Sequence, residues 1–299
     1  MNMTDKKILI IGGEGYIGSH LCRFLRNKDI NVETYGNRKT DFNLLVSEYL
    51  LQYEYIILLA GHSSVGRCVG ELKSPWNNNV RNFYNLMEKT NINHKIIYAS
   101  SSSVYGNKGG KIFNENDISL EYINNYDLTK TSLDLLSNQY QSKGRQVIGL
   151  RFGTVNGGST VIRRDLMINA MVHTALNEGV INVNNKNIYR PILAINDLSR
   201  AIYTIITNNF HSGAYNLSSF YSNVDEISKL VKEKTKVNII DKGEFQGVYN
   251  FITDTSKFET IYNFKFEESI ETIIEDVVDC YKNQKPNVVM RNEYFDYKG

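Results

Sequence analysis

Cysteine and proline are scarce in this sequence, with three of each among 299 residues. Cys22, Cys68 and Cys280 lie far apart, form no C-x-x-C pair and have no histidine at ligand spacing. An odd, dispersed set of thiols is typical of reduced cysteines in the cytoplasm and not of a disulfide framework or a zinc site. So few prolines leave no visible flexible linker between domains. We therefore expect a cytoplasmic protein with no metal site.

An excess of one charge and long apolar runs are also missing. The 34 lysines and arginines nearly balance the 32 acidic residues, for a net charge of +2, and no long basic run occurs. Nucleic-acid binding normally needs such a basic footprint, so we expect no nucleic-acid partner. The first apolar run, 8–11, stops at Gly12 and is too short for a signal-peptide core or a membrane span. We expect no membrane partner and a small-molecule ligand.

Short β-branched runs alternate with segments of helical period over the first half of the chain. This order predicts an α/β fold, a Rossmann-type doubly wound parallel sheet with a smaller C-terminal substrate-binding lobe. We expect the Rossmann domain to comprise residues 1–160 and returning segments at about 188–217, and the lobe to comprise about 161–187 and 218–299. The main predicted strands are 7–11, 31–35, 55–60, 95–99 and 146–152. The main predicted helices are 16–27, 43–51, 76–90, 125–143, 166–177, 197–207, 224–235 and 268–282.

Glycines recur at three-residue spacing directly after the first predicted strand and before the first predicted helix. Glycine at these positions lets the backbone turn tightly and approach a pyrophosphate, which the N–H groups of the helix N-terminus then face. An ordinary glycine-rich turn is the alternative, but the strand–turn–helix context favours a dinucleotide site. We expect the dinucleotide to contact Gly12, Gly15, Tyr16, Ile17 and Gly18.

The second predicted strand ends without the acidic residue that usually binds the adenosine ribose in a Rossmann site. Asn37, Arg38 and Lys39 stand there instead. The two cations supply hydrogen-bond donors for a 2′-phosphate, so we expect Asn37 and Arg38 to contact NADP, with NAD as the alternative cofactor. A solvated basic turn would also explain them, and Asp41 is close enough to compete as a ribose ligand.

A hydroxyl, a phenol and an amine that could act together in proton transfer follow the strand predicted at 95–99. Ser101 ends that strand, and Tyr126 and Lys130 lie four residues apart near the start of the helix predicted at 125–143. Residues four apart share one helical face, so the Lys130 ammonium is expected to lower the pKa of the Tyr126 phenol. We predict that Tyr126 exchanges a proton with the substrate, that Lys130 also holds the cofactor ribose, and that Ser101 orients the reacting oxygen.

Together these motifs resemble the extended short-chain dehydrogenases/reductases, the group of nucleotide-sugar epimerases, dehydratases and reductases. Further segments similar to that family follow in order at 58–65, 75–80, 150–157, 190–198, 215–217 and 254–257. The resemblance implies that Leu59, Ala60, Gly61, Asn79 and Ala99 also contact the cofactor. It further implies that Asn79 positions the backbone of the active-site helix. It implies that Ser102, Ser103, Thr154 and Arg190 contact a nucleotide-sugar substrate, with Arg190 on a phosphate. His62, at the end of a strand, is expected to contact the substrate or the cofactor, with a hydrogen bond to the backbone as the alternative. The resemblance also implies a homodimer formed through the helices at 76–90 and 125–143.

Departures from the family pattern narrow the expected reaction. Dehydratases of this group carry an Asp-Glu pair where Ser102 and Ser103 stand, and hydroxyls cannot perform that acid–base chemistry. Of the remaining reactions, Arg38 and the short link between the second and third strands favour a reductase. We expect NADPH-dependent reduction of a 4-keto group on a nucleotide-activated deoxysugar, with the proton from Tyr126. The alternatives are a 4-epimerase with bound NAD and a non-catalytic NADP-binding sensor or scaffold.

Overall fold

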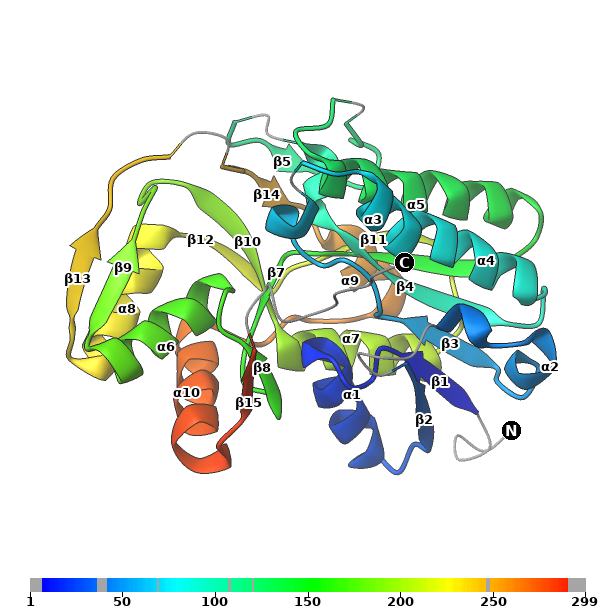
Figure 1. Ribbon diagram of the computed structural model, residues 1–299, viewed down its shortest axis with the longest axis horizontal. Coiled ribbons are helices and arrows are strands. Elements are labelled where there is room, and N and C mark those ends of the chain that lie inside the picture. Colours follow the sequence, from blue (N-terminus) through cyan, green and yellow to red (C-terminus); the bar gives the residue numbers. More distant parts are fainter. Residues whose placement is uncertain are drawn as a thin grey trace.

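A six-stranded parallel sheet forms the centre of the protein in a computed structural model (Figure 1). The structure describes residues 7–36, 42–68, 70–106, 109–119, 121–245 and 248–289. The strand order is β11-β6-β4-β3-β1-β2, and all five pairings are parallel. The strands are β1 (Ile8–Ile11), β2 (Val32–Tyr35), β3 (Tyr55–Leu58), β4 (Lys95–Ser101), β6 (Gln146–Phe152) and β11 (Gly213–Leu217). The predicted Rossmann-type sheet is confirmed, and β2 is an edge strand.

Helices cover both faces of this sheet. In Figure 1, α4 (Asn82–Lys89) and α5 (Asn125–Ser142) lie above it, and α1 (Tyr16–Arg26) and α7 (Ile195–Thr207) lie below. Side chains alternate between the faces of a strand, so Ile8 and Ile10 belong to the core under α1 while Leu9 and Ile11 belong to the core under α4. This double burial explains why the strand reads as an uninterrupted apolar run.

The second lobe lies to the left in Figure 1 and gathers short sheets and three helices. Its helices are α6 (Met167–Glu178), α8 (Val224–Thr235) and α10 (Ile270–Asp279). Its paired strands are β7 (Thr154–Asn156), β10 (Tyr189–Ala194) and β12 (Phe220–Asn223) in one sheet, β9 (Val180–Val183) with β13 (Asn238–Asp241), and β8 (Val161–Arg163) with β15 (Asn287–Val289). Between the lobes, β5 (Ile112–Phe113) pairs with β14 (Ile252–Thr253).

The chain returns to the main sheet through α7 and β11, within the segment expected at 188–217. One helix from the segment expected in the lobe, α9 (Ser256–Tyr262), also packs against β11. There, Lys257 donates a hydrogen bond to the carbonyl of Ala214 at 2.8 Å. The family-like segment 254–257 therefore supports the last strand of the sheet.

Three predicted helices differ in detail from the structure. The helix expected at 268–282 is α10 followed by a π-helical turn, Cys280–Gln284. The helix expected at 43–51 is a 3-10 turn, Phe42–Leu44, followed by the short α2 (Ser47–Leu50). The helix expected at 76–90 begins with α3 (Lys73–Pro75) and a π-helical turn, Trp76–Arg81, before α4. Among the described residues, no helix is long and apolar enough to cross a membrane.

Candidate active site

The glycine turn between β1 and α1 has the geometry that a dinucleotide requires. Gly12 has φ of +92°, and a Cβ there would lie 2.7 Å from the backbone nitrogen of Ala60. A Cβ on Gly18 would overlap the carbonyl oxygen of Gly12. Gly15 caps α1 without a side-chain hydrogen bond, and the first turn of α1 contains no acidic residue. The residues present therefore fit a pyrophosphate held by free N–H groups at this helix N-terminus.

The loop after β3 is tied to α5 by Asn79. Its Oδ1 accepts a hydrogen bond from the backbone N–H of His62 at 2.8 Å, and its Nδ2 donates to Thr129 Oγ1 at 3.0 Å. Asn79 is buried and is not among the residues that line the cavity described below. It therefore holds two cavity-forming segments together, and its expected contact with the cofactor stays a prediction.

Ser101, Tyr126 and Lys130 converge in the structure although 29 residues of sequence separate the first from the last. Asn124 caps α5 by accepting a hydrogen bond from the N–H of Asp127 at 3.1 Å, which starts the helix beside the end of β4. A hydrogen bond with Ser101 lowers the pKa of the Tyr126 phenol. The Nζ of Lys130 lies 5.7 Å from the centre of the Tyr126 ring. The three side chains thus form one reaction centre.

The protonation of this centre differs from the sequence prediction. Burial raises the pKa of Tyr126 to about 12, and the Ser101 hydrogen bond and the charge of Arg163 only partly oppose the rise. Lys130 donates to the carbonyl of Ala99 at 2.8 Å, and burial lowers its own pKa to about 8. The pKa of the phenol is therefore raised overall, not lowered as expected, and a lowering contribution from the Lys130 ammonium stays a prediction. At neutral pH the phenol is protonated and ready to donate a proton.

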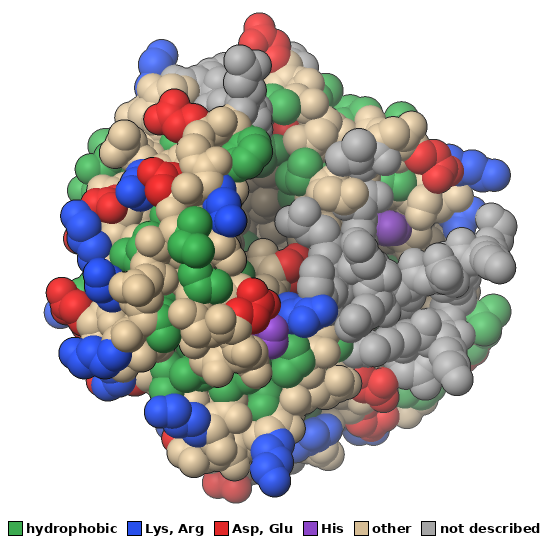
Figure 2. Space-filling model, turned by 60° about the vertical axis from the view of Figure 1, so that its left-hand side comes forward, with side chains coloured by type: hydrophobic (Ala, Val, Ile, Leu, Met, Phe, Trp, Pro, Cys, Tyr) green, Lys and Arg blue, Asp and Glu red, His purple; other side chains and the backbone are tan. Residues whose placement is uncertain are grey.

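A cavity of about 760 Å³ opens in front of these residues between the two lobes. Figure 2 shows the surface hollowed near the middle of one face. The cavity is lined by these predicted residues: Tyr16, Ile17, Leu59, Ala60, Gly61, His62, Ala99, Ser101, Ser102, Ser103, Tyr126, Lys130, Thr154 and Arg190. Gly12, Gly15 and Gly18 are in the glycine turn and are not among the lining residues, and Asn37 and Arg38 lie outside the described residues.

Among the cavity residues that were not predicted from the sequence, Arg163 and Tyr249 make polar contacts that are at least partly buried. Arg163, on β8, binds both carboxylate oxygens of Asp165 and donates to Ser63 Oγ at 3.2 Å. Tyr249 donates its hydroxyl hydrogen to Asp127 Oδ1 at 2.7 Å. The contacts that bring these two residues to the site join distant positions, because Ser63 is 100 positions from Arg163 and Asp127 is 122 positions from Tyr249.

Arg190 has the surroundings expected of an anion-binding side chain. Its guanidinium lies 5.5 Å from the centre of the Tyr249 ring, and one of its nitrogens donates to the Tyr249 carbonyl at 3.4 Å. Its Nε is buried without a hydrogen-bond partner within the described part of the chain. The side chain as a whole is only partly buried and lines the cavity, so the rest of its guanidinium is a candidate to bind a phosphate there.

Comparisons with known proteins agree with this geometry. The model of the NAD dependent epimerase/dehydratase family matches residues 8–218. Protein CapI of Staphylococcus aureus is 26% identical, and the alignment covers 92% of this chain and 98% of CapI. A UDP-glucuronic acid 4-epimerase from Bacillus cereus, solved with UDP-glucuronic acid and NAD, has the same fold, with a TM-score of 0.80, 20% identity and coverage of 93% of this chain and 99% of that one.

A second solved structure, RMD from Pseudomonas aeruginosa complexed with NADPH, is also similar. Its TM-score is 0.79 at 17% identity, with coverage of 93% of this chain and 99% of that one. The two structures carry different nicotinamide cofactors, so the fold is compatible with both. From the match over residues 8–218 and the motifs it contains, this chain belongs to the NAD dependent epimerase/dehydratase family, within the extended short-chain dehydrogenases/reductases.

Proposed function

We propose that this enzyme interconverts a hydroxyl and a keto group at carbon 4 of the sugar in a nucleotide sugar, and that it works mainly as an NADPH-dependent 4-ketoreductase. The observation that carries the proposal is the convergence of Ser101, Tyr126 and Lys130 on one cavity next to the glycine turn. When bound, the nicotinamide supplies the hydride. The glycine turn, Ala60 and Lys130 would hold the dinucleotide.

The side chains of this chain supply the proton and the orientation. Tyr126 donates its phenolic proton to the sugar oxygen as the general acid. Ser101 hydrogen-bonds the same oxygen and keeps it beside the phenol. Lys130 is anchored through the Ala99 carbonyl, which leaves its other N–H groups for the cofactor ribose. A neutral phenol is the form that a reduction consumes, and burial favours that form in Tyr126.

A 4-epimerase with retained NAD is the second candidate. It is favoured by the similarity to the Bacillus cereus 4-epimerase, whose structure holds a UDP-sugar and NAD. Dehydration is disfavoured by the residues of the site, because Ser102 and Ser103 line the cavity where dehydratases of the family carry acids. Ser102 and Ser103 have no titratable proton to exchange near neutral pH.

One set of assays separates these functions. GDP-, dTDP-, CDP- and UDP-linked 4-keto sugars are incubated with NADPH, and the matching 4-hydroxy sugars are incubated without added cofactor. A reductase oxidises NADPH in step with product formation. An epimerase interconverts two nucleotide sugars without added cofactor and releases NAD when denatured. Cofactor binding with neither reaction would overturn the proposal in favour of a sensor or scaffold.

The cofactor preference is tested by Arg38→Ala. If Arg38 binds the 2′-phosphate, this variant weakens NADPH binding about tenfold to a hundredfold, since a hydrogen bond to a charged group is worth roughly 1.5–3 kcal/mol. Binding of NADH, which lacks that phosphate, stays unchanged. Both affinities are measured by fluorescence titration. An unaltered ratio of the two affinities would assign the cofactor preference to other residues.

Arg190→Met tests the phosphate contact in the substrate site. Methionine keeps the apolar contact with Tyr249 but removes every donor, so we expect the KM for the nucleotide sugar to rise about tenfold or more. The kcat should change by no more than about threefold, because the reacting oxygen is positioned by other residues. Arg200→Met, on α7 and away from the cavity residues, is the matched control. Equal KM values for the two variants would contradict the assignment.

We also propose that the enzyme forms a homodimer through its 76–90 and 125–143 segments. Trp76, Tyr84 and Leu135 are exposed there, with 39%, 47% and 46% of their surfaces accessible. Large exposed apolar side chains on these two segments, which pack against each other, support an interface between copies of the chain. The molar mass in solution, measured by light scattering, decides between monomer and dimer.

A further inference from the structure

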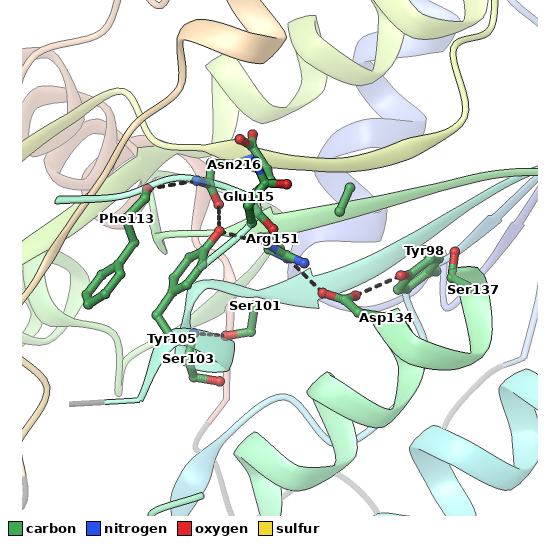
Figure 3. Close-up of polar contacts among 12 residues, drawn as sticks. Tyr98, Ser101, Ser103, Tyr105, Phe113, Glu115, Asp134, Ser137, Arg151 and Asn216 are labelled. Atoms are coloured by element: carbon green, nitrogen blue, oxygen red, sulfur yellow. Dashed lines mark hydrogen bonds and ion pairs between the residues drawn. The ribbon is translucent and has the colours of Figure 1, made fainter. Parts of the chain in front are cut away.

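A buried polar network lies behind the reaction centre (Figure 3). Asp134 stands on α5 one turn after Lys130, and its Oδ2 accepts a hydrogen bond from Arg151 Nε at 2.7 Å. Its other oxygen accepts from the hydroxyl of Tyr98 at 2.7 Å. Only 1% of the Asp134 side chain and 2% of the Arg151 side chain are exposed. Neither lines the cavity, so this ion pair is inaccessible to substrate.

Arg151 connects α5 to the turn that follows Ser101. From β6, its guanidinium also donates to the hydroxyl of Tyr105 at 2.9 Å and to the carbonyl of Glu115 at 2.8 Å. Tyr105 is the last residue of a 3-10 turn, Ser102–Tyr105, that begins directly after Ser101. Ser101 accepts a hydrogen bond from the N–H of Ser103 in that turn at 3.2 Å. One guanidinium therefore bridges the two segments that carry the reaction centre.

The network continues to the last strand of the sheet. Tyr105 donates its hydroxyl hydrogen to Asn216 Oδ1 on β11 at 2.5 Å. Asn216 donates from its backbone N–H to Glu115 Oε1 at 2.8 Å and from its Nδ2 to the carbonyl of Phe113 at 3.2 Å. The Tyr105 hydroxyl at the end of the turn after Ser101 is thus held by both Arg151 and Asn216, as Figure 3 shows.

Stability alone is a poor explanation for burying this ion pair. Removing two charges from water is costly, and well-packed apolar residues often stabilise a core equally well. The ion pair instead fixes the orientation of the side chains that it joins, because a hydrogen bond is strong only within a narrow range of angles. The ion pair joins the helix that carries Lys130 to the turn that follows Ser101, so it orients these two segments relative to each other.

We propose that Asp134 and Arg151 are positioning residues, which fix the turn carrying Ser101 against the helix carrying Tyr126 and Lys130. This inference rests on the proposed function, because it assigns a role within the same reaction. The pair does not touch the reacting atoms. It sets the distance and direction between Ser101 and the Tyr126 phenol.

Asp134 also acts electrostatically on Lys130. Burial lowers the pKa of Lys130 to about 8, and the Asp134 carboxylate opposes that fall. The other groups that face Lys130 are the Cys68 thiol and the Tyr126 ring, and the Ala99 carbonyl accepts its hydrogen bond. Asp134→Asn removes a negative charge, so the pKa of Lys130 falls further. The alkaline limb of the pH–rate profile then moves to lower pH, because Lys130 loses its proton earlier.

The test compares stability with activity in matched variants. Asp134→Leu and Arg151→Met each leave one buried charge without its partner and should lower the urea midpoint of unfolding. The double variant Asp134→Leu/Arg151→Met removes both charges and should recover most of that loss. Its kcat should stay at least about tenfold low, since small misplacements of reacting groups are costly. Its KM should stay near the wild-type value.

Asp197→Asn is the control for losing a buried carboxylate elsewhere. Asp197 is fully buried, pairs with Arg200 at 2.6 Å and is not among the cavity residues. The Asp197→Asn variant should have a lower urea midpoint of unfolding but an unchanged kcat and pH–rate profile. If the double variant recovers both stability and kcat, or if Asp134→Asn leaves the pH profile unmoved, the pair is merely structural and the inference is overturned.

Failure of the proposed function would look different, since the wild-type enzyme would then be inactive with every sugar tested. A measurement that needs no activity remains in that case. The Ser103 amide donates to Ser101 Oγ, so it should exchange its hydrogen faster in the double variant than in wild type. In Asp197→Asn it should exchange at the wild-type rate. Equal exchange in the double variant and wild type would refute the positioning role by itself.

Discussion

Tyr126→Phe is expected to lower kcat about 10³-fold, within the range that general acid catalysis contributes. Phenylalanine keeps the ring and its packing but removes the proton that the substrate oxygen must receive. Folding should be little affected, because the Tyr126 hydroxyl mainly contacts Ser101 within the cavity. Cofactor affinity should also stay near the wild-type value. The rate is measured from NADPH oxidation with the accepted 4-keto sugar, or from epimer formation if that is the reaction.

Tyr140→Phe provides the matched control for this variant. Tyr140 lies on the same helix, is also buried, and donates its hydroxyl hydrogen to Glu88 at 2.6 Å. It is not among the cavity residues, so its loss should leave kcat unchanged. If Tyr126→Phe retained wild-type activity, the proton would come from another group and the proposed mechanism would fail.

The sequence predicted the parts of the site that depend on local spacing. The glycine turn and the Tyr126–Lys130 pair are encoded within seven and five consecutive residues, and helical and strand periods determine where such residues point. Ser101 could be added because it ends a strand next to the predicted helix. The parallel sheet followed from the alternation of apolar runs and helical segments.

The remaining features depend on contacts between distant residues. Spacing placed Lys130 on the same face as Tyr126, but only the structure shows that its Nζ donates to the Ala99 carbonyl. Arg163 lies on β8, which pairs with β15, and it donates a hydrogen bond to Ser63. No local sequence pattern predicts this contact. The π-helical turn at Trp76–Arg81 was also missed, because its residues have the same apolar spacing as an α-helix.

Gly18→Ala is expected to lower both folding stability and cofactor affinity, because α1 packs closely against the glycine turn. The new Cβ would overlap the Gly12 carbonyl oxygen and would lie 2.7 Å from Gly13 Cα and 2.9 Å from the Gly12 carbonyl carbon. All three are backbone atoms of a tight turn, so α1 itself has to shift. Overpacking of this kind costs roughly 1–3 kcal/mol of folding stability.

The same shift should disrupt dinucleotide binding, because the pyrophosphate depends on the N–H groups at the start of α1. We expect Gly18→Ala to lower the urea midpoint of unfolding and to weaken binding of NADPH and NADH alike by at least about tenfold, roughly 1.4 kcal/mol. Gly15→Ala is the control for stability, since its Cβ would meet only the Gly12 oxygen, at 3.3 Å. A Gly18→Ala protein as stable as wild type, with unchanged affinity for both cofactors, would mean that the turn does not hold the dinucleotide.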